Sequence, residues 1–113
     1  MPQQAMPQQI LPRELSQHLA AGRPVCLVDV RQPWEHQLAA LSGSTLIPLN
    51  ELSQRAGEIH APADGLVVIY CHHGVRSLSA AAYLERLGIQ NVRSLAGGID
   101  AWSCEIDPAM PRY

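Results

Sequence analysis

Short runs of apolar residues alternate along this chain with stretches in which apolar and polar residues are mixed. The run at residues 25–30 is almost continuously apolar, and a second such run at residues 66–70 follows a Pro-Ala-Asp-Gly turn. Runs of this kind are typical of strands that are covered on both faces. The segments at residues 45–49 and 92–95 predict two further strands, of which the second has Arg93 and Ser94 between two apolar residues.

The stretches between the strands have the spacing of helices. Residues 12–22 place Leu15 and Leu19 one turn apart, begin with a proline and end with Gly22. The same reasoning predicts a short helix that contains Trp34 and Leu38, and two further helices at residues 77–87 and 99–106. Another predicted helix is capped by Asn50 and carries Leu52, Ala56 and Ile59. Alternating strands and helices predict an α/β fold, with a four- or five-stranded, mainly parallel sheet and helices on both faces.

The length of 113 residues fits one domain. We expect a flexible arm at residues 1–9, which are rich in Gln and Pro, and a domain at residues 10–113. The net charge of -2, without a basic block, predicts no binding of nucleic acid. The apolar runs are far shorter than the roughly 20 residues of a membrane span, and the start lacks a signal-peptide pattern, so we expect a cytoplasmic protein without a membrane partner.

A cysteine directly after the strand at residues 66–70 is the most informative feature for function. Cys71 opens a loop that contains Gly74 and leads into a helix. The backbone N–H groups of residues 72–77, the helix dipole and the charge of Arg76 all favour a thiolate over a thiol at this cysteine. Cys71 is therefore the predicted nucleophile, and the alternative is a buried strand-end cysteine that only packs in the core. The spacing of the three cysteines gives no sign of a disulfide framework or a structural zinc site.

The number of residues between Cys71 and Arg76 indicates what the loop can enclose. Four residues separate them. In protein tyrosine phosphatases the cysteine and the arginine are spaced as C-x5-R, in a loop that surrounds a tetrahedral phosphate. A loop that is one residue shorter should be too narrow for phosphate or arsenate, but it can enclose one additional sulfur atom. The spacing favours sulfur transfer, with a small cysteine phosphatase or arsenate reductase as an alternative.

Nearly the whole chain, from residue 10 to the end, resembles a single-domain rhodanese, a sulfurtransferase. The matching motifs are DVR at residues 29–31 followed by Pro33 and Glu35, IPL at 47–49, CHHGVRS at 71–77 and LAGGIDAW at 95–102. Residues 41–44 depart from the family, since many relatives carry a Gly-His-Ile segment there. We expect this departure to change the turn before the strand at residues 45–49.

The resemblance implies a two-step exchange of sulfur. Cys71 attacks the outer sulfur of a donor such as thiosulfate, keeps it as a persulfide and passes it to a thiophilic acceptor, which is cyanide, a thiol or a sulfur-carrier protein. Arg76 would hold the anionic donor, and the loop amides would stabilise the persulfide. The resemblance implies neither a metal nor an organic cofactor. The second alternative is a rhodanese-like module that binds a protein partner without turnover.

The predicted substrate-binding loop around Cys71 consists of His72, His73, Gly74, Val75, Arg76 and Ser77. The two histidines either shape the mouth of the pocket or are exposed without a role. Adjacent side chains on one tight loop are poorly placed to share a metal ion with the cysteine.

Asp29 and Arg31 are the predicted supporting residues, and they either orient the cysteine loop or form a local ion pair with Glu35. Ligands bind beyond the carboxyl ends of parallel strands, so we expect one crevice shared by the loops at residues 29–34 and 71–77 and the turn at 97–98. Trp34 and Trp102 either flank this crevice or pack in the core. Of the other two cysteines, Cys26 is expected in the core. Cys104 is either a core or surface residue without a chemical role or a second thiol near the pocket.

Overall fold

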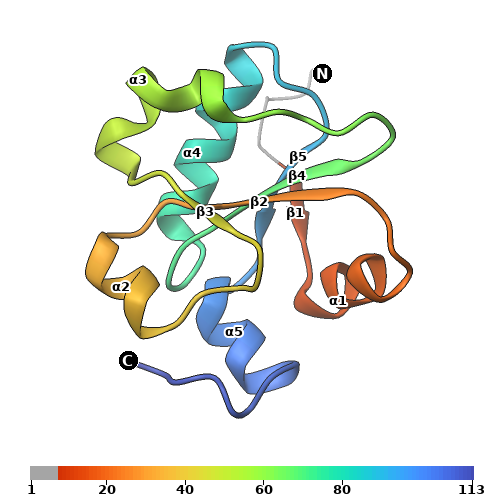
Figure 1. Ribbon diagram of the computed structural model, residues 1–113, viewed down its shortest axis with the longest axis vertical. Coiled ribbons are helices and arrows are strands. Elements are labelled where there is room, and N and C mark those ends of the chain that lie inside the picture. The colour runs from red at the N-terminus through yellow and green to blue at the C-terminus, as the bar shows by residue number, and fades with distance from the viewer. Residues whose placement is uncertain (1–7) are drawn as a thin grey trace, which may run out of the picture.

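The computed structural model describes residues 8–113. Five parallel strands form one sheet in the order β1-β5-β4-β2-β3 (Figure 1). The strands are β1 (Gln8–Ile10), β2 (Val25–Asp29), β3 (Thr45–Leu46), β4 (Leu66–Tyr70) and β5 (Val92–Leu95). The helices are α1 (Pro12–Ala20), α2 (Pro33–Leu38), α3 (Leu52–Arg55), α4 (Val75–Arg86) and α5 (Gly98–Glu105). The predicted α/β fold with a parallel sheet is confirmed.

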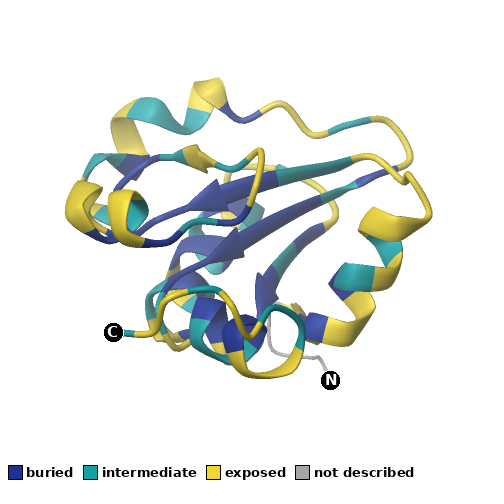
Figure 2. Ribbon diagram, turned by 60° about the horizontal axis from the view of Figure 1, so that its bottom comes forward, coloured by how far each residue is buried: buried dark blue, intermediate teal, exposed yellow. Residues whose placement is uncertain are grey.

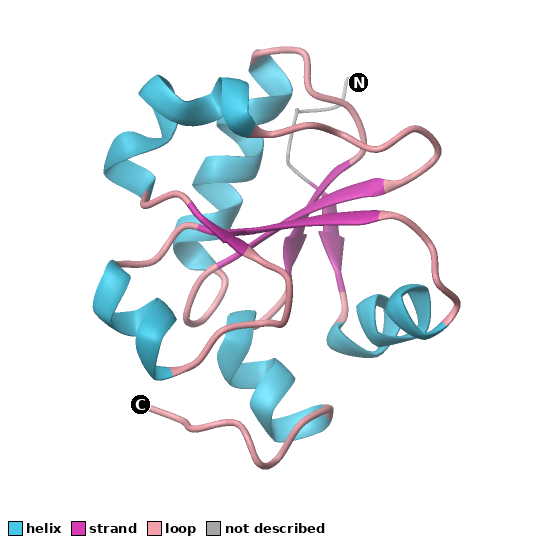
Figure 3. Cartoon of the chain, in the orientation of Figure 1, coloured by secondary structure: helices cyan, strands magenta, loops and turns pink. Residues whose placement is uncertain are grey.

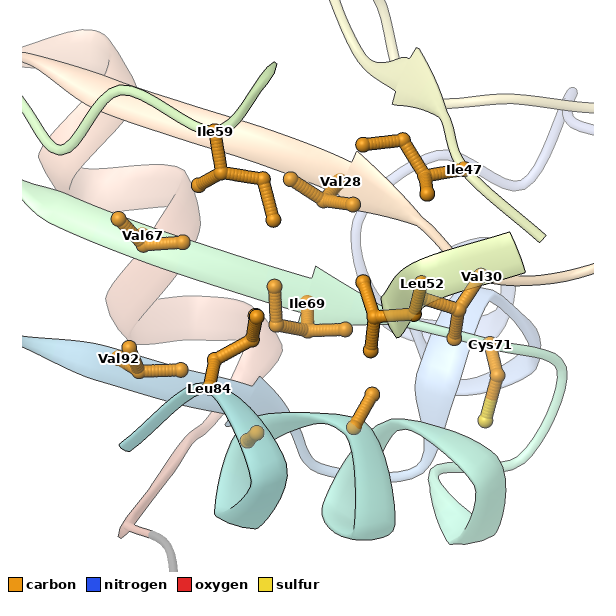
Figure 4. Close-up of a cluster of buried hydrophobic side chains, with 12 residues drawn as sticks. Val28, Val30, Ile47, Leu52, Ile59, Val67, Ile69, Cys71, Leu84 and Val92 are labelled. Carbon is orange, nitrogen blue, oxygen red and sulfur yellow. The ribbon is translucent and has the colours of Figure 1, made fainter. Parts of the chain in front are cut away.

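Helices lie over both faces of the sheet, and most residues of its strands are buried (Figure 2). Side chains along each strand alternate between the two faces. From β4, Val67 and Ile69 pack on one face, in the same cluster as Leu84 of α4 (Figure 4). Val68 and Tyr70 pack on the other face, in a cluster that also holds residues of α1 and α5. Among residues 8–113, no helix is both long enough and apolar enough to cross a membrane.

The chain joins the sheet at Gln8, before the predicted domain start at residue 10. Gln8 and Gln9 pair with β5 through their backbones while their side chains are exposed. An edge strand of this kind needs no apolar side chains, so hydrophobic patterning did not reveal it. Residues 1–7 of the predicted arm lie outside the described residues.

Two elements between β2 and β4 differ from the prediction (Figure 3). The strand at residues 45–49 is only Thr45–Leu46, although the N–H groups of Ile47 and Leu49 still donate to the carbonyls of Asp29 and Val30. The predicted long helix is a 3₁₀ turn, the short helix α3 and a second 3₁₀ turn. Asn50 lies inside the first turn and does not cap α3, but Leu52 and Ile59 still reach the core.

Candidate active site

The cysteine loop begins where β4 ends, and β4 is the middle strand of the sheet. The side chain of Cys71 points from the end of β4 toward the start of α4 (Figure 4). Gly74 has φ of 96°, a left-handed conformation that glycine adopts without a steric cost. This turn lets α4 begin at Val75 instead of the predicted residue 77, so the N-terminus of the helix lies closer to the sulfur.

Several hydrogen-bonding groups converge on the sulfur of Cys71. The backbone N–H groups of Gly74 and Ser77 donate to Sγ, with N···S distances of 3.1 and 3.4 Å. The Ser77 hydroxyl oxygen lies 3.5 Å from Sγ and 2.7 Å from the hydroxyl oxygen of Ser94 on β5. Donors in this arrangement stabilise negative charge on sulfur, whether it belongs to a thiolate or to a bound persulfide.

The sulfur lies at the bottom of the loop and not at the surface. Cys71 is only 1 % exposed, whereas Val75 on the rim is 73 % exposed. A cysteine reacts only where a donor can reach its sulfur, and in this structure Cys71 is almost closed to solvent. This burial is what the alternative of a strand-end cysteine packed in the core predicts.

Arg76 forms a bidentate ion pair with Glu35 of α2. Its two terminal nitrogens lie 3.0 Å from the two carboxylate oxygens. Glu35 is 3 % exposed and also accepts hydrogen bonds from the backbone N–H of Gln32 and the hydroxyl of Tyr113. Burial raises the pKa of Glu35, but the hydrogen bonds from Arg76, Gln32 and Tyr113 together lower it to about 2. The carboxylate is therefore ionised at neutral pH and neutralises Arg76.

Asp29 and Arg31 form a second bidentate pair, in which both side chains are fully buried. Arg31 also donates to the backbone carbonyl of Ala39 and to the hydroxyl of Tyr113. The structure places neither residue as predicted: Arg31 hydrogen-bonds Asp29 and not the cysteine loop, and it reaches Glu35 only through Tyr113.

Tyr113 is a site residue that the sequence did not reveal. Its ring stacks on His72 with 3.9 Å between ring centroids, and His72 stacks on His73 at the same distance. Trp34 packs edge-on against Tyr113 at 5.6 Å and is 60 % exposed, so this tryptophan flanks the site. Tyr113 and Arg31 are 82 positions apart in the sequence, and no spacing rule links them.

The remaining predicted side chains do not reach the sulfur. Trp102 is buried in the core, and Cys26 packs against the other core cluster. Burial raises the pKa of the Cys26 thiol. Cys104 is exposed on α5.

Three side chains could hold a cation at the mouth of the loop. Nitrogens of His72 and His73 and a carboxylate oxygen of Asp100 lie within 4.8 Å of one another. Burial, followed by the charge of His73, lowers the pKa of His72 and favours a neutral ring. Arg112 already donates to both carboxylate oxygens of Asp100, at 2.9 and 3.2 Å, so a cation would have to displace this arginine.

The turn before α5 lies directly against the cysteine loop. Gly98 has φ of 63°, and a Cβ atom added there would lie 2.4 Å from the carbonyl oxygen of His72 and 2.5 Å from that of Cys71. The N–H groups of Ile99 and Asp100 donate to the same two carbonyls at 2.9 and 3.0 Å. The N-terminus of α5 therefore holds the loop in place through backbone contacts.

The family model for the Rhodanese-like domain matches residues 11–105. The chain belongs to the rhodanese-like family. A protein of Allochromatium vinosum named sulfurtransferase is 43% identical over 89 residues, which cover 79% of this rhodanese-like chain and 81% of that protein. The probable adenylyltransferase/sulfurtransferase MoeZ of Mycobacterium tuberculosis is 38% identical over 104 residues, or 92% of this chain. The match covers 26% of MoeZ, so the chain spans about a quarter of that relative.

Solved structures have the same fold as this rhodanese-like chain. A rhodanese-related protein from Thermoplasma volcanium superimposes with a TM-score of 0.77 at 29% identity, covering 88% of this chain and 93% of that one. The human single-domain sulfurtransferase TSTD1 gives a TM-score of 0.74 at 28% identity, covering 86% of this chain and 96% of that one. The predicted membership of the rhodanese family is confirmed.

Proposed function

We propose that this rhodanese-like chain is a sulfurtransferase that moves a sulfane sulfur from a donor such as thiosulfate to a thiophilic acceptor through a persulfide on Cys71. The observation that carries the proposal is the pair of N–H groups, from Gly74 and Ser77, directed at the sulfur of Cys71. The short loop between Cys71 and Arg76 supports it, as do the relatives named as sulfurtransferases.

In the first half of the reaction the thiolate of Cys71 attacks the outer sulfur of the donor. A sulfur–sulfur bond forms on the enzyme, the sulfur–sulfur bond of thiosulfate breaks, and sulfite leaves with the electron pair. The hydroxyl of Ser77, which Ser94 supports, is placed to accept the thiol proton. In the second half the acceptor attacks the outer sulfur of the persulfide, and Cys71 leaves as a thiolate.

The acceptor in this proposal is a thiol or a sulfur-carrier protein, with cyanide as a laboratory substitute. The exposed side chains of Val75 and Trp34 lie beside the loop, where a larger acceptor can make contact. We expect the reaction to take place in the cytoplasm, because its reducing conditions keep Cys71 as a free thiol.

Mass spectrometry of the intact protein tests this function. Incubation with excess thiosulfate should add about 32 Da, the mass of one sulfur atom, and cyanide should remove it. The Cys71→Ser variant should lose the adduct, and the matched Cys104→Ser variant should keep it. A module that only binds a partner would show no adduct, and a cysteine phosphatase would instead turn over a generic aryl phosphate. Either result contradicts the proposal.

A further inference from the structure

Three guanidinium groups lie beside the cysteine loop, and a carboxylate neutralises each of them. The shortest N–O distances are 2.6, 3.0 and 2.9 Å for the pairs Arg31–Asp29, Arg76–Glu35 and Arg112–Asp100. The chain contains no lysine that could add a further positive charge. Arg76 is the only one of the three arginines that belongs to the loop itself, and its charge is balanced by that of Glu35.

Thiosulfate would bring two negative charges to a sulfur that reacts as an anion. Like charges repel most strongly where water is excluded, so an uncompensated cation beside the sulfur would favour such a donor. Arg76 is the obvious candidate, but both of its terminal nitrogens bind Glu35. If Arg76 turned toward a donor, it would leave a buried carboxylate without its cation.

The rim of the loop offers apolar surface instead of free charge. Val75 is 73 % exposed and Trp34 is 60 % exposed. The ring of Tyr113 lies between Trp34 and His72, so aromatic surface continues toward the loop. An organic group gains free energy when it covers such surface, whereas an oxyanion does not.

We propose that the donor for Cys71 is an organic sulfane compound with at most one negative charge, and that Glu35 disfavours the thiosulfate dianion by neutralising Arg76. This inference rests on the proposed sulfurtransferase function and narrows its donor to organic persulfides and thiosulfonates. Glu35 is a specificity-determining residue that acts through the charge of Arg76.

The chemistry of the step is balanced for both donor types. With an organic persulfide R–S–SH, the Cys71 thiolate bonds to the outer sulfur, the original sulfur–sulfur bond breaks, and R–S⁻ leaves with the electron pair. With a thiosulfonate R–SO₂–S⁻, the leaving group is the sulfinate R–SO₂⁻. Neither reaction needs an external oxidant or reductant.

A matched pair of donors tests the inference. Methanethiosulfonate differs from thiosulfate by a methyl group in place of one charged oxygen, so it carries one negative charge less. The measured quantity is the ratio of kcat/KM for methanethiosulfonate to kcat/KM for thiosulfate, with cyanide as acceptor. Comparing this ratio between variants cancels the difference in leaving-group chemistry.

Two single variants should move the ratio in opposite directions. Glu35→Gln leaves Arg76 uncompensated and should lower the ratio about tenfold, the effect expected for one additional charge interaction at a partly exposed site. Arg76→Gln leaves Glu35 uncompensated and should raise the ratio. The double variant restores the neutral charge balance, so its ratio should return to the wild-type value. A loss of packing alone would not produce this pattern.

The wild-type protein provides a test that needs no substitution. Because a neutral entrance leaves only repulsion between the thiolate and the dianion, kcat/KM for thiosulfate should stay constant or rise as salt screens the charges. A fall with added salt would mean that a free cation attracts thiosulfate, and it would overturn the inference. An unchanged donor ratio in both single variants would overturn it as well.

Alkylation separates this inference from the proposed function. In a Cys26→Ser/Cys104→Ser background, Glu35→Gln should increase the rate of reaction of Cys71 with anionic iodoacetate relative to neutral iodoacetamide. If neither donor adds sulfur to Cys71, the proposed function fails while this rate ratio still reports the charge that Glu35 controls. An unchanged rate ratio would contradict the role of Glu35 even in an active sulfurtransferase.

Discussion

Replacing Gly98 with alanine should damage the cysteine loop from outside, without changing any residue of the loop. The added Cβ would lie 2.4 Å from the carbonyl oxygen of His72 and 2.5 Å from that of Cys71. Both neighbours are backbone atoms, so no flexible side chain can move aside. The loop and the start of α5 must therefore separate, which weakens the hydrogen bonds from Ile99 and Asp100 to these carbonyls.

The free energy of the change can be divided into two parts. A non-glycine residue in the left-handed region costs about 1–2 kcal/mol. Two weakened hydrogen bonds add about 1 kcal/mol each. The sum predicts that Gly98→Ala lowers the free energy of unfolding by about 3–4 kcal/mol, which most small domains survive.

Gly22→Ala is the matched control. Gly22 has φ of 72°, similar to that of Gly98, but a Cβ atom there would have nothing within 4 Å. This control should show only the conformational part of the loss. Urea unfolding measures both variants, and the rate at which iodoacetamide alkylates Cys71 should fall only in Gly98→Ala. Equal losses of stability in the two variants, with equal alkylation rates, would refute the argument that Gly98 positions the loop.

Three further outcomes follow from the site. Ser94→Ala should slow alkylation of Cys71 severalfold at neutral pH, because it removes the hydroxyl that hydrogen-bonds to Ser77. Ser79→Ala, at an exposed position, should leave the alkylation rate unchanged. Tyr113→Phe should lower the unfolding free energy by about 1–3 kcal/mol in urea, since a buried guanidinium loses its acceptor, and Tyr83→Phe is the control with no hydroxyl hydrogen bond within residues 8–113. The pKa of Glu35 falls from the ordinary 4.5 to about 2, so its stabilisation is complete above pH 4.5 and disappears as the pH falls toward 2; Glu35→Gln should flatten this part of the stability curve.

Elements with their own pattern were predictable from the sequence. The strands β2 and β4 are nearly continuous apolar runs, and α1 has both start and stop signals. β1 was missed, because two of its three side chains are exposed and polar. The segment around Asn50 was predicted as one helix because its apolar spacing is helical, but its backbone follows the turns that the neighbouring elements impose.

The contiguous part of the site was also predictable, since Cys71 and the groups that face its sulfur from the loop are neighbours in sequence. The groups that balance the charge of Arg76 come from distant segments of the chain. Glu35 and Arg76 are 41 positions apart, and Tyr113 is 78 positions from Glu35. A sequence shows that such residues carry charge or an aromatic ring, but not which partner each will find after folding.

The central position of β4 has a consequence for the local stability of the backbone around Cys71. β4 is flanked by β5 and β2, whereas the short strands β1 and β3 form the edges of the sheet. In hydrogen exchange, central strands open only with global unfolding, and edges fray much earlier. Cys71 is thus anchored to the part of the domain that persists longest, while Glu35 and Tyr113 approach from its periphery. In the proposed sulfurtransferase, substitutions at Glu35 or Tyr113 would therefore change which donor is accepted while the sulfur of Cys71 keeps its position.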